Sequence, residues 1–351
     1  MKFNYKKLLK CLAKGVVFLL LFLMIFNYTD FVLRQKTETE TLHLIAERPN
    51  DYYDVILAGS SHMQYSIQPA LLYGEYGIVA CNTATAAQSV PNSYFMIKEM
   101  AARHKPELVV LDLFCLFYDD VYFSPTRFHQ ATDCFPLSLN KLDAIGSLVK
   151  EGHSEFYINY LLYHGRWKEL KKTDYVLRDD FHETYQFING LEIFDEPYAP
   201  LDPDDTADIP EIPLEYLKKI VDFCKEEDIE LLLTVIPYRA DQDNNDTSAV
   251  FQQQVYNTAA KLAEEWDVDF LNTLYCLDEL DFDFTADMIE YSHVNVGGSR
   301  KVGEFYGKYL KENYDLPDRT GDKKYAEWQG FYEDFLATEA ELLSVELIPR
   351  G

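Results

Sequence analysis

Two short stretches, far apart in the sequence, hold residue types that together could activate a serine nucleophile. Residues 59–62 read GSSH and residues 290–293 read EYSH. A serine hydroxyl attacks well only when a base takes its proton, and a histidine base needs a carboxylate on its other ring nitrogen. The three-residue step from Glu290 to His293 lets the acid reach the imidazole on a turn. The sequence therefore suggests Ser61 as nucleophile, His293 as base and Glu290 as the orienting acid.

The order of secondary structure elements indicates how these residues are positioned. From residue 53 apolar strand-like runs alternate with helical stretches. Strands are predicted from 53, at 78–82, from 107, at 229–237 and at 268–273, and helices at 69–76, 91–104, 213–227, 249–266 and 297–310. Successive β/α units imply a parallel sheet with helices on both faces. We therefore expect a three-layer α/β fold around a central five-stranded parallel sheet.

The carboxyl ends of these strands are where an open parallel sheet binds its ligands. Residues 59–62, 82–84 and 112–116 and the loop before the last helix, which includes His293, all fall there. The same loop holds Asp287, an alternative to Glu290 as the orienting acid. Asn295 is expected to cap the helix that follows or to brace the loop.

The regular pattern breaks between about residues 118 and 208, a span rich in Tyr, Phe, His and Asp. We interpret this span as an insertion, because no Gly/Ser-rich or Pro-rich linker divides the chain into two domains. The expected organisation is a lysine-rich flank and anchor at 1–35, an α/β domain at 36–316 and an acidic helical tail at 317–351.

The N-terminus has the pattern of a membrane anchor. Five lysines precede residue 15, no acidic residue occurs before Asp30, and residues 15–26 are uninterrupted apolar. Extended to Leu33, the run approaches the roughly 20 residues that a bilayer requires. A lysine-rich flank stays on the cytoplasmic side, which predicts a single-pass protein of the cytoplasmic membrane with its C-terminal domain outside. A cleaved signal peptide is the alternative, but no small-x-small cleavage site follows.

Composition argues against several function classes. With 59 acidic and 32 basic residues the formal charge is −27, which disfavours a general nucleic-acid surface. Cysteine and histidine spacings match no zinc site, and the glycine near Ser61 does not extend into a nucleotide-binding loop. We therefore expect no nucleic-acid partner, no metal and no cofactor.

Four blocks of sequence carry a family resemblance: AGSSHMQYSIQPALL at 58–72, CNTATAAQS at 81–89, KPELVVLDL at 105–113 and DMIEYSHVNVGGSRKVGEFYGKYL at 287–310. They resemble the SGNH/GDSL hydrolase superfamily. More narrowly, they resemble its membrane-anchored extracytoplasmic branch, which includes D-alanyl-lipoteichoic acid biosynthesis and alginate O-acetylation proteins. The resemblance covers about 53–311 without the insertion and implies a flavodoxin-like three-layer fold. It also implies Ser61 as nucleophile, His293 as base and Glu290 in place of the usual Asp.

The resemblance further implies an oxyanion site and shows where this chain departs from the pattern. The backbone N–H groups of Ser61 and Ala84 would hold the oxyanion, with Ala84 in place of the usual glycine. The usual Gly-x-Asn-Asp of the third block is absent, so one oxyanion donor is unassigned. Either the activity is slow or this donor comes from the insertion.

Four residues are candidates for binding substrate. His62 and Asn82 lie beside the expected nucleophile, and His62 could instead be an exposed neighbour. His164 and Arg166 belong to YHGRW at 163–167, whose residue types bind sugars, carboxylates or phosphates, although a structural clamp is an equal alternative.

Two functions remain open from the sequence. The first is a serine esterase or O-acyltransferase that acts on an acyl ester or cell-envelope glycan, with a membrane-bound O-acyltransferase as the partner implied by resemblance. The second is a glycan-binding or scaffold subunit with a decayed catalytic set, which the missing third-block Asn favours.

Overall fold

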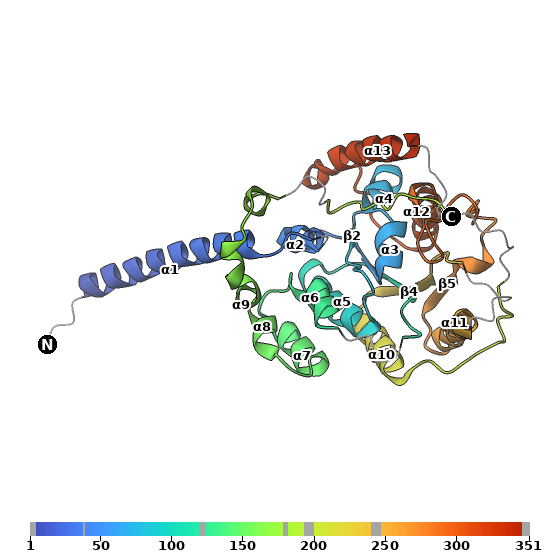
Figure 1. Ribbon diagram of the computed structural model, residues 1–351, viewed down its shortest axis with the longest axis horizontal. Helices are drawn as coiled ribbons and strands as arrows, with labels where there is room; N and C mark the ends of the chain where they lie inside the picture. The colour runs from blue at the N-terminus through green and yellow to red at the C-terminus, as the bar shows by residue number, and fades with distance from the viewer. Residues whose placement is uncertain are drawn as a thin grey trace.

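The computed structural model describes residues 5–37, 39–118, 124–177, 182–192, 200–239 and 247–345 (Figure 1). Five strands form one parallel sheet in the order β2-β1-β3-β4-β5. Their bounds are β1 (Val55–Ala58), β2 (Ala80–Asn82), β3 (Leu108–Asp112), β4 (Glu230–Val235) and β5 (Asp269–Asn272). This is the flavodoxin-like strand order, so the expected five-stranded parallel sheet is confirmed.

Helices cover both faces of the sheet, as strands that are apolar on both sides require. Side chains of β1 alternate: Ile56 packs in the core on the side of α5, α10 and α11, and Leu57 in the core on the side of α4 and α12. The helices that connect the strands, together with the helix after β5, are α3 (Ser61–Ser66), α4 (Pro69–Tyr76), α5 (Val90–His104), α10 (Glu211–Glu226), α11 (Thr247–Glu265) and α12 (Val296–Asn313). The molecule thus has the three layers predicted from the β/α rhythm.

Between β3 and α10 the described chain forms short helices that extend the α5 side of the domain. They are α6 (Pro125–Thr132), α7 (Leu139–Leu148), α8 (His153–Tyr157), α9 (Asn159–Tyr163) and the 3₁₀ helices η2 (His164–Lys168) and η3 (Lys172–Tyr175). Helices α6 and α7 pack on α5, and α8 packs between α7 and α9. No strand is described in these residues, which explains why the β/α pattern breaks here.

The C-terminal part completes the core. After the 3₁₀ helices η4 (Thr273–Tyr275) and η5 (Lys323–Tyr325), helix α13 (Trp328–Ser344) lies along α4 at the edge of the molecule (Figure 1). Trp328 is fully buried, packs on the ring of Tyr73 and donates its indole N–H to the hydroxyl of Tyr52 at 3.0 Å. The C-terminal residues 317–345 therefore contribute buried side chains to the core and do not only cover its surface.

The N-terminal helix α1 (Tyr5–Leu33) projects away from the domain, and the shorter α2 (Glu40–Glu47) follows it (Figure 1). Among the described residues α1 is the one helix that is long and apolar enough to cross a membrane. Its side chains at residues 9–25 are exposed, whereas Val32 and Leu33 are buried in the domain. The end of this helix is thus anchored in the fold.

Candidate active site

Ser61, His293 and Glu290 form a continuous hydrogen-bonded chain. The imidazole Nε2 of His293 lies 2.8 Å from the hydroxyl oxygen of Ser61, and its Nδ1 makes a short contact with a carboxylate oxygen of Glu290. With the carboxylate as acceptor, Nδ1 carries the proton and Nε2 is free to accept from the serine. The side chains of His293 and Glu290 are 24% and 29% exposed, so the site opens to solvent. In this arrangement Nε2 of His293 is placed to accept a proton from the hydroxyl of Ser61.

The turn from β1 into α3 presents Ser61. Gly59 has φ of +148°, and a Cβ there would lie 3.0 Å from the Cβ of Asp112, so this position requires glycine. Ser60 then caps α3, accepting from the N–H of His62 at 3.4 Å. Ser61 is the first residue of the helix, where N–H groups have no acceptor within the helix.

A tight loop before α12 presents His293 and Glu290. Met288 and Val294 form an antiparallel bridge, and the N–H of Ile289 donates to the carbonyl of His293 at 2.9 Å, so residues 290–292 make the tip. Asn295 then caps α12, accepting from the N–H of Gly298 at 3.0 Å, as predicted. A Cβ on Gly298 would lie 2.3 Å from the carbonyl oxygen of Asp287, so glycine lets the helix start against this loop.

Hydrogen bonding keeps Glu290 in its charged form. Burial raises the pKa of its carboxyl, but hydrogen bonds from His293 and Ser292 and the charge of His293 outweigh burial, and the pKa is lowered from 4.5. The hydroxyl of Ser292 donates to the same carboxylate oxygen at 2.6 Å. Glu290 is therefore an ionised acceptor for the Nδ1 proton at neutral pH.

Asp287 does not take the position of the orienting acid. Its carboxylate accepts from the N–H of Asp283 at 2.7 Å and pairs with Lys301 at 2.8 Å, and the side chain is buried. These bonds fix the start of the loop to α12, so Asp287 is a brace for the loop and Glu290 is the acid beside His293.

His62 points into the interior and not toward a substrate. Only 1% of the residue is exposed, so it is neither the substrate ligand nor the exposed neighbour that the sequence suggested. Its Nδ1 lies 3.3 Å from the carboxylate of Asp112 and its Nε2 lies 3.1 Å from the carbonyl oxygen of Pro237. The ring thus bonds the end of β3 and the chain after β4 to the turn that holds Ser61.

Asn82 and Ala84 also have structural partners. The amide nitrogen of Asn82 donates to the carbonyls of Ile67 at 3.0 Å and Met63 at 3.2 Å, and the side chain is buried. Its amide oxygen accepts from the N–H of Ala84 at 3.2 Å. Asn82 is therefore a tie between β2 and α3 and not a substrate ligand, and the Ala84 N–H expected at the oxyanion is already bonded.

His164 and Arg166 lie at the end of α1 and not at Ser61. Two carbonyls of the chain leaving α1, those of Leu33 and Arg34, accept from Arg166 at 2.6 and 2.8 Å, and Asp174 accepts from its other terminal nitrogen at 2.8 Å. His164 is exposed and its Nδ1 lies 2.7 Å from the carbonyl of Leu161. The contacts of both residues agree with the alternative of a structural clamp and not with substrate binding. Neither residue belongs to the candidate active site.

Two neighbours of His293 are not among the residues predicted from the sequence. Ser292 shares the carboxylate of Glu290, and the ring of Tyr65 meets the ring of His293 edge to face at 5.9 Å. Tyr65 follows Ser61 by four residues in α3, a spacing that puts both on one face of the helix. That spacing was the signal available from the sequence.

No family model and no curated protein matches the chain. Solved structures with a similar arrangement include an acetyl xylan esterase, at 12% identity over 73% of this chain and 98% of the other, with a TM-score of 0.38. A GDSL-like lipase from Bacteroides thetaiotaomicron matches at 11% identity over 78% of this chain and 95% of the other, with a TM-score of 0.36. The assignment of roles below therefore depends on the geometry of this chain's own residues.

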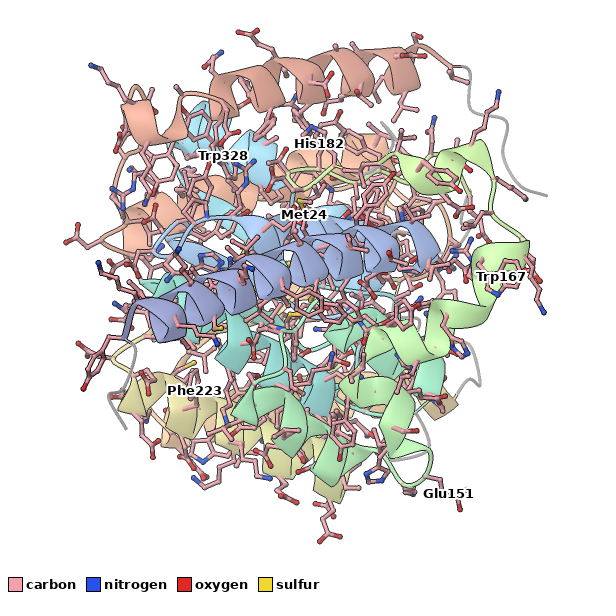
Figure 2. The ribbon with its side chains drawn as sticks, turned by 90° about the vertical axis from the view of Figure 1, so that its left-hand side faces the viewer. Met24, Glu151, Trp167, His182, Phe223 and Trp328 are labelled. Carbon is pink, nitrogen blue, oxygen red and sulfur yellow. The ribbon has the colours of Figure 1, made fainter. Side chains whose placement is uncertain are left out.

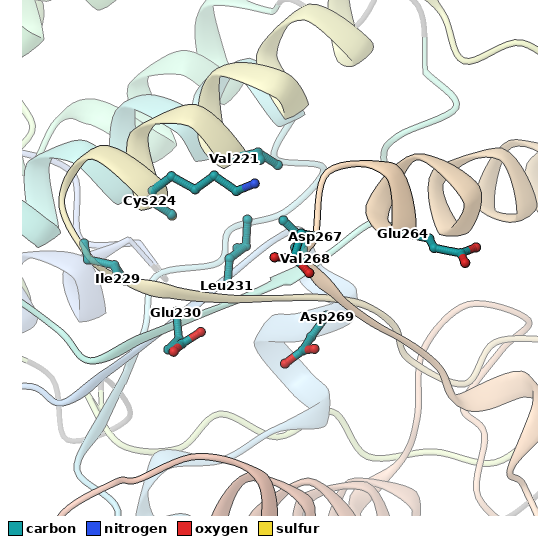
Figure 3. Close-up of a pocket in the computed structure, with 10 residues that line it drawn as sticks. Val221, Cys224, Ile229, Glu230, Leu231, Glu264, Asp267, Val268 and Asp269 are labelled. Carbon is teal, nitrogen blue, oxygen red and sulfur yellow. The ribbon is translucent and has the colours of Figure 1, made fainter.

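Two surface hollows lie apart from the serine. One of about 390 Å³ is lined by Lys225, Glu230, Asp267 and Asp269, at the amino ends of β4 and β5 (Figure 3). In a parallel sheet this is the edge opposite to the one that carries Ser61. A second, of about 770 Å³, lies along α12 and includes Phe305. Neither is lined by Ser61, His293 or Glu290.

Proposed function

We propose that the protein is a serine esterase or O-acyltransferase of the SGNH type. The observation that carries this proposal is the hydrogen-bonded chain from Ser61 through His293 to Glu290, set at the carboxyl ends of the strands. The strand order reverses between β1 and β3, and ligands of such sheets bind in the crevice beside that point. Ser61, which directly follows β1, lies at that point of the sheet.

In the mechanism, His293 Nε2 takes the proton of Ser61 while the serine oxygen attacks the carbonyl carbon of an ester. The carboxylate of Glu290 stabilises the imidazolium that forms, and His293 then gives the proton to the departing alcohol. The acyl group remains on Ser61. A second alcohol or water, deprotonated by His293, attacks the acyl-serine and releases the product and the free hydroxyl of Ser61. The N–H of Ser61 is the backbone donor available for the oxyanion.

We further propose that α1 is retained as a membrane anchor. Phe26 packs on Tyr160 with ring centroids 5.4 Å apart. Val32 and Leu33 at the end of α1 are buried, and the carbonyl of Leu33 accepts from Arg166. If the apolar helix were cleaved off as a signal peptide, the residues of α1 that make these contacts would be lost. With the lysines inside, the α/β domain would lie outside the cytoplasmic membrane.

The substrate proposal follows from this location and from the sequence resemblance. An anchored domain outside the membrane would meet acyl esters of cell-envelope glycans, and a membrane-bound O-acyltransferase would supply the acyl group. Both the glycan and this partner are proposals that the resemblance supports.

Labelling with a fluorophosphonate probe tests the catalytic proposal. The full chain in detergent should be labelled, and Ser61→Ala and His293→Ala should lose labelling while their thermal unfolding stays cooperative. Ser147→Ala is the control, because it removes an exposed serine hydroxyl in α7, away from Ser61, and should leave labelling in place. A folded Ser61→Ala variant that still reacts would overturn the mechanism.

The alternative is a glycan-binding or scaffold subunit with a decayed catalytic set. The hydrogen bond from the Ala84 N–H to Asn82 supports this alternative, because this N–H was expected to hold the oxyanion and already has an acceptor. A folded wild-type chain that is not labelled but binds acylated glycan would favour this alternative.

A further inference from the structure

Residues 158–176, here called the flanking segment, expose large apolar side chains beside α1. Trp167 is 64% exposed, Val176 56%, Tyr175 49% and Leu161 46%. Side chains of this size and exposure, close together in one short segment, indicate a surface that is covered in use. The segment comprises α9, η2, η3 and the residues between and beside them.

The flanking segment surrounds the place where α1 leaves the domain. Helices α9, η2 and η3 all pack on α1, Tyr160 contacts Phe26, and Arg166 bonds the carbonyls of Leu33 and Arg34. Figure 1 shows α8 and α9 on the side from which α1 projects, and Figure 2, viewed from that side, shows Met24 on α1 with Trp167 at the rim of the same face.

The length of α1 fixes the level at which a bilayer would end. About 20 helical residues cross the hydrocarbon core, so a span that begins after Lys10 or Lys14 ends between Asp30 and Arg34. The contacts of the flanking segment run from Phe26 to Arg34, a rise of about 12 Å along the helix axis. This interval covers the rim of the hydrocarbon core and the headgroup region.

The charge of the flanking segment differs from that of the chain. It has four basic and two acidic residues, whereas the whole chain has 32 basic and 59 acidic. Lys168, Lys171 and Lys172 are exposed, and the ammonium of Lys168 lies 5.4 Å from the ring of Trp167. Exposed Trp and Tyr together with Lys are the residue types that settle at a membrane interface, and the lysines match anionic headgroups.

We propose that the flanking segment docks on the anionic surface of the bilayer that α1 crosses, with Trp167 among the headgroups. This inference rests on the anchoring in the proposed function and adds a second point of attachment. Two attachments restrict rotation of the domain about α1, so the α/β domain would hold one orientation to the membrane.

Fluorescence of the full chain in vesicles tests this surface. Phosphatidylcholine vesicles with and without phosphatidylglycerol would contain lipid brominated near the headgroup, which quenches a tryptophan that touches it. We expect quenching in the wild type that is lost in Trp167→Phe and kept in Trp266→Phe, the matched control. Combined Lys168→Gln, Lys171→Gln and Lys172→Gln should remove the extra quenching that phosphatidylglycerol gives.

Flotation of the same vesicles after an alkaline wash reports the anchor separately. Protein that floats but shows the same quenching in wild type and Trp167→Phe would overturn the docking proposal, since the segment would then face water or another protein. Protein that does not float would overturn the anchoring, and the docking proposal with it. Fluorophosphonate labelling of Ser61 is independent of both outcomes.

Discussion

His62 and Asp112, 50 positions apart in sequence, meet in the interior directly behind the turn that presents Ser61. The imidazole Nδ1 lies 3.3 Å from the Asp112 carboxylate, Nε2 lies 3.1 Å from the carbonyl oxygen of Pro237, and both side chains are fully buried. Each ring nitrogen therefore lies within hydrogen-bonding distance of an oxygen acceptor. The pair joins the carboxyl ends of β1 and β3, where the strand order reverses.

Asp112→Asn should therefore weaken both the fold and the reactivity of Ser61. Replacing the carboxylate weakens a buried hydrogen-bonded pair, and a buried polar group left without its partner costs about 1–3 kcal/mol. Thermal unfolding and the rate of fluorophosphonate labelling measure the two effects. Asp133→Asn is the matched control: it breaks the His129–Asp133 pair of 2.7 Å within α6 and its C-cap, and labelling should not change. Equal labelling rates in both variants would contradict a positioning role for His62 and Asp112.

The two acids of the loop before α12 should have separable roles. Glu290→Gln removes the negative charge beside His293 and should slow labelling by about 100- to 10,000-fold, within the range that removal of a catalytic carboxylate or donor produces elsewhere. Asp287→Asn breaks the pair with Lys301 but leaves Glu290 in place, so it should lower the melting temperature and slow labelling far less. Labelling kinetics of both variants decide the question, and a larger loss in Asp287→Asn would reverse the assignment.

The lowered pKa of Glu290 predicts a pH dependence of stability. Because the folded-state pKa lies below the ordinary 4.5, ionised Glu290 stabilises the fold at pH values above 4.5, and this contribution is lost as the pH falls through the lower folded value. The difference in melting temperature between wild type and Glu290→Gln should therefore narrow as the pH falls below 4.5. A difference that widens as the pH falls would show that the sign of the pKa shift is wrong.

The sequence was informative where local pattern determines structure. Alternation of apolar runs and helical stretches predicted the five strands, and the ends of strands brought Ser61 and His293 to one edge of the sheet. The step from Glu290 to His293 was readable because a three-residue turn brings the two side chains together.

Side-chain direction and long-range packing were not readable. His62 follows Ser61 in α3 and Asn82 ends the neighbouring strand β2, but both side chains point inward. Asp112 bonds His62 there, and the carbonyls of Met63 and Ile67 accept from Asn82. Arg166 has residue chemistry suited to a substrate, yet its partner is the end of α1, more than 130 positions away. No local sequence pattern predicts which distant carbonyl an arginine side chain will contact.

Asn82→Ala tests whether the tie between β2 and α3 matters for Ser61. The substitution leaves the carbonyl of Ile67 and the N–H of Ala84 without their buried partner, which should destabilise the fold by about 1–3 kcal/mol. Since α3 carries the serine, labelling should also slow. Asn140→Ala is the matched control: its amide donates to the carbonyl of Phe95 at 2.9 Å, so it should cost comparable stability with labelling unchanged. Faster labelling in Asn82→Ala would instead mean that release of the Ala84 N–H supplies the oxyanion donor that Asn82 now occupies.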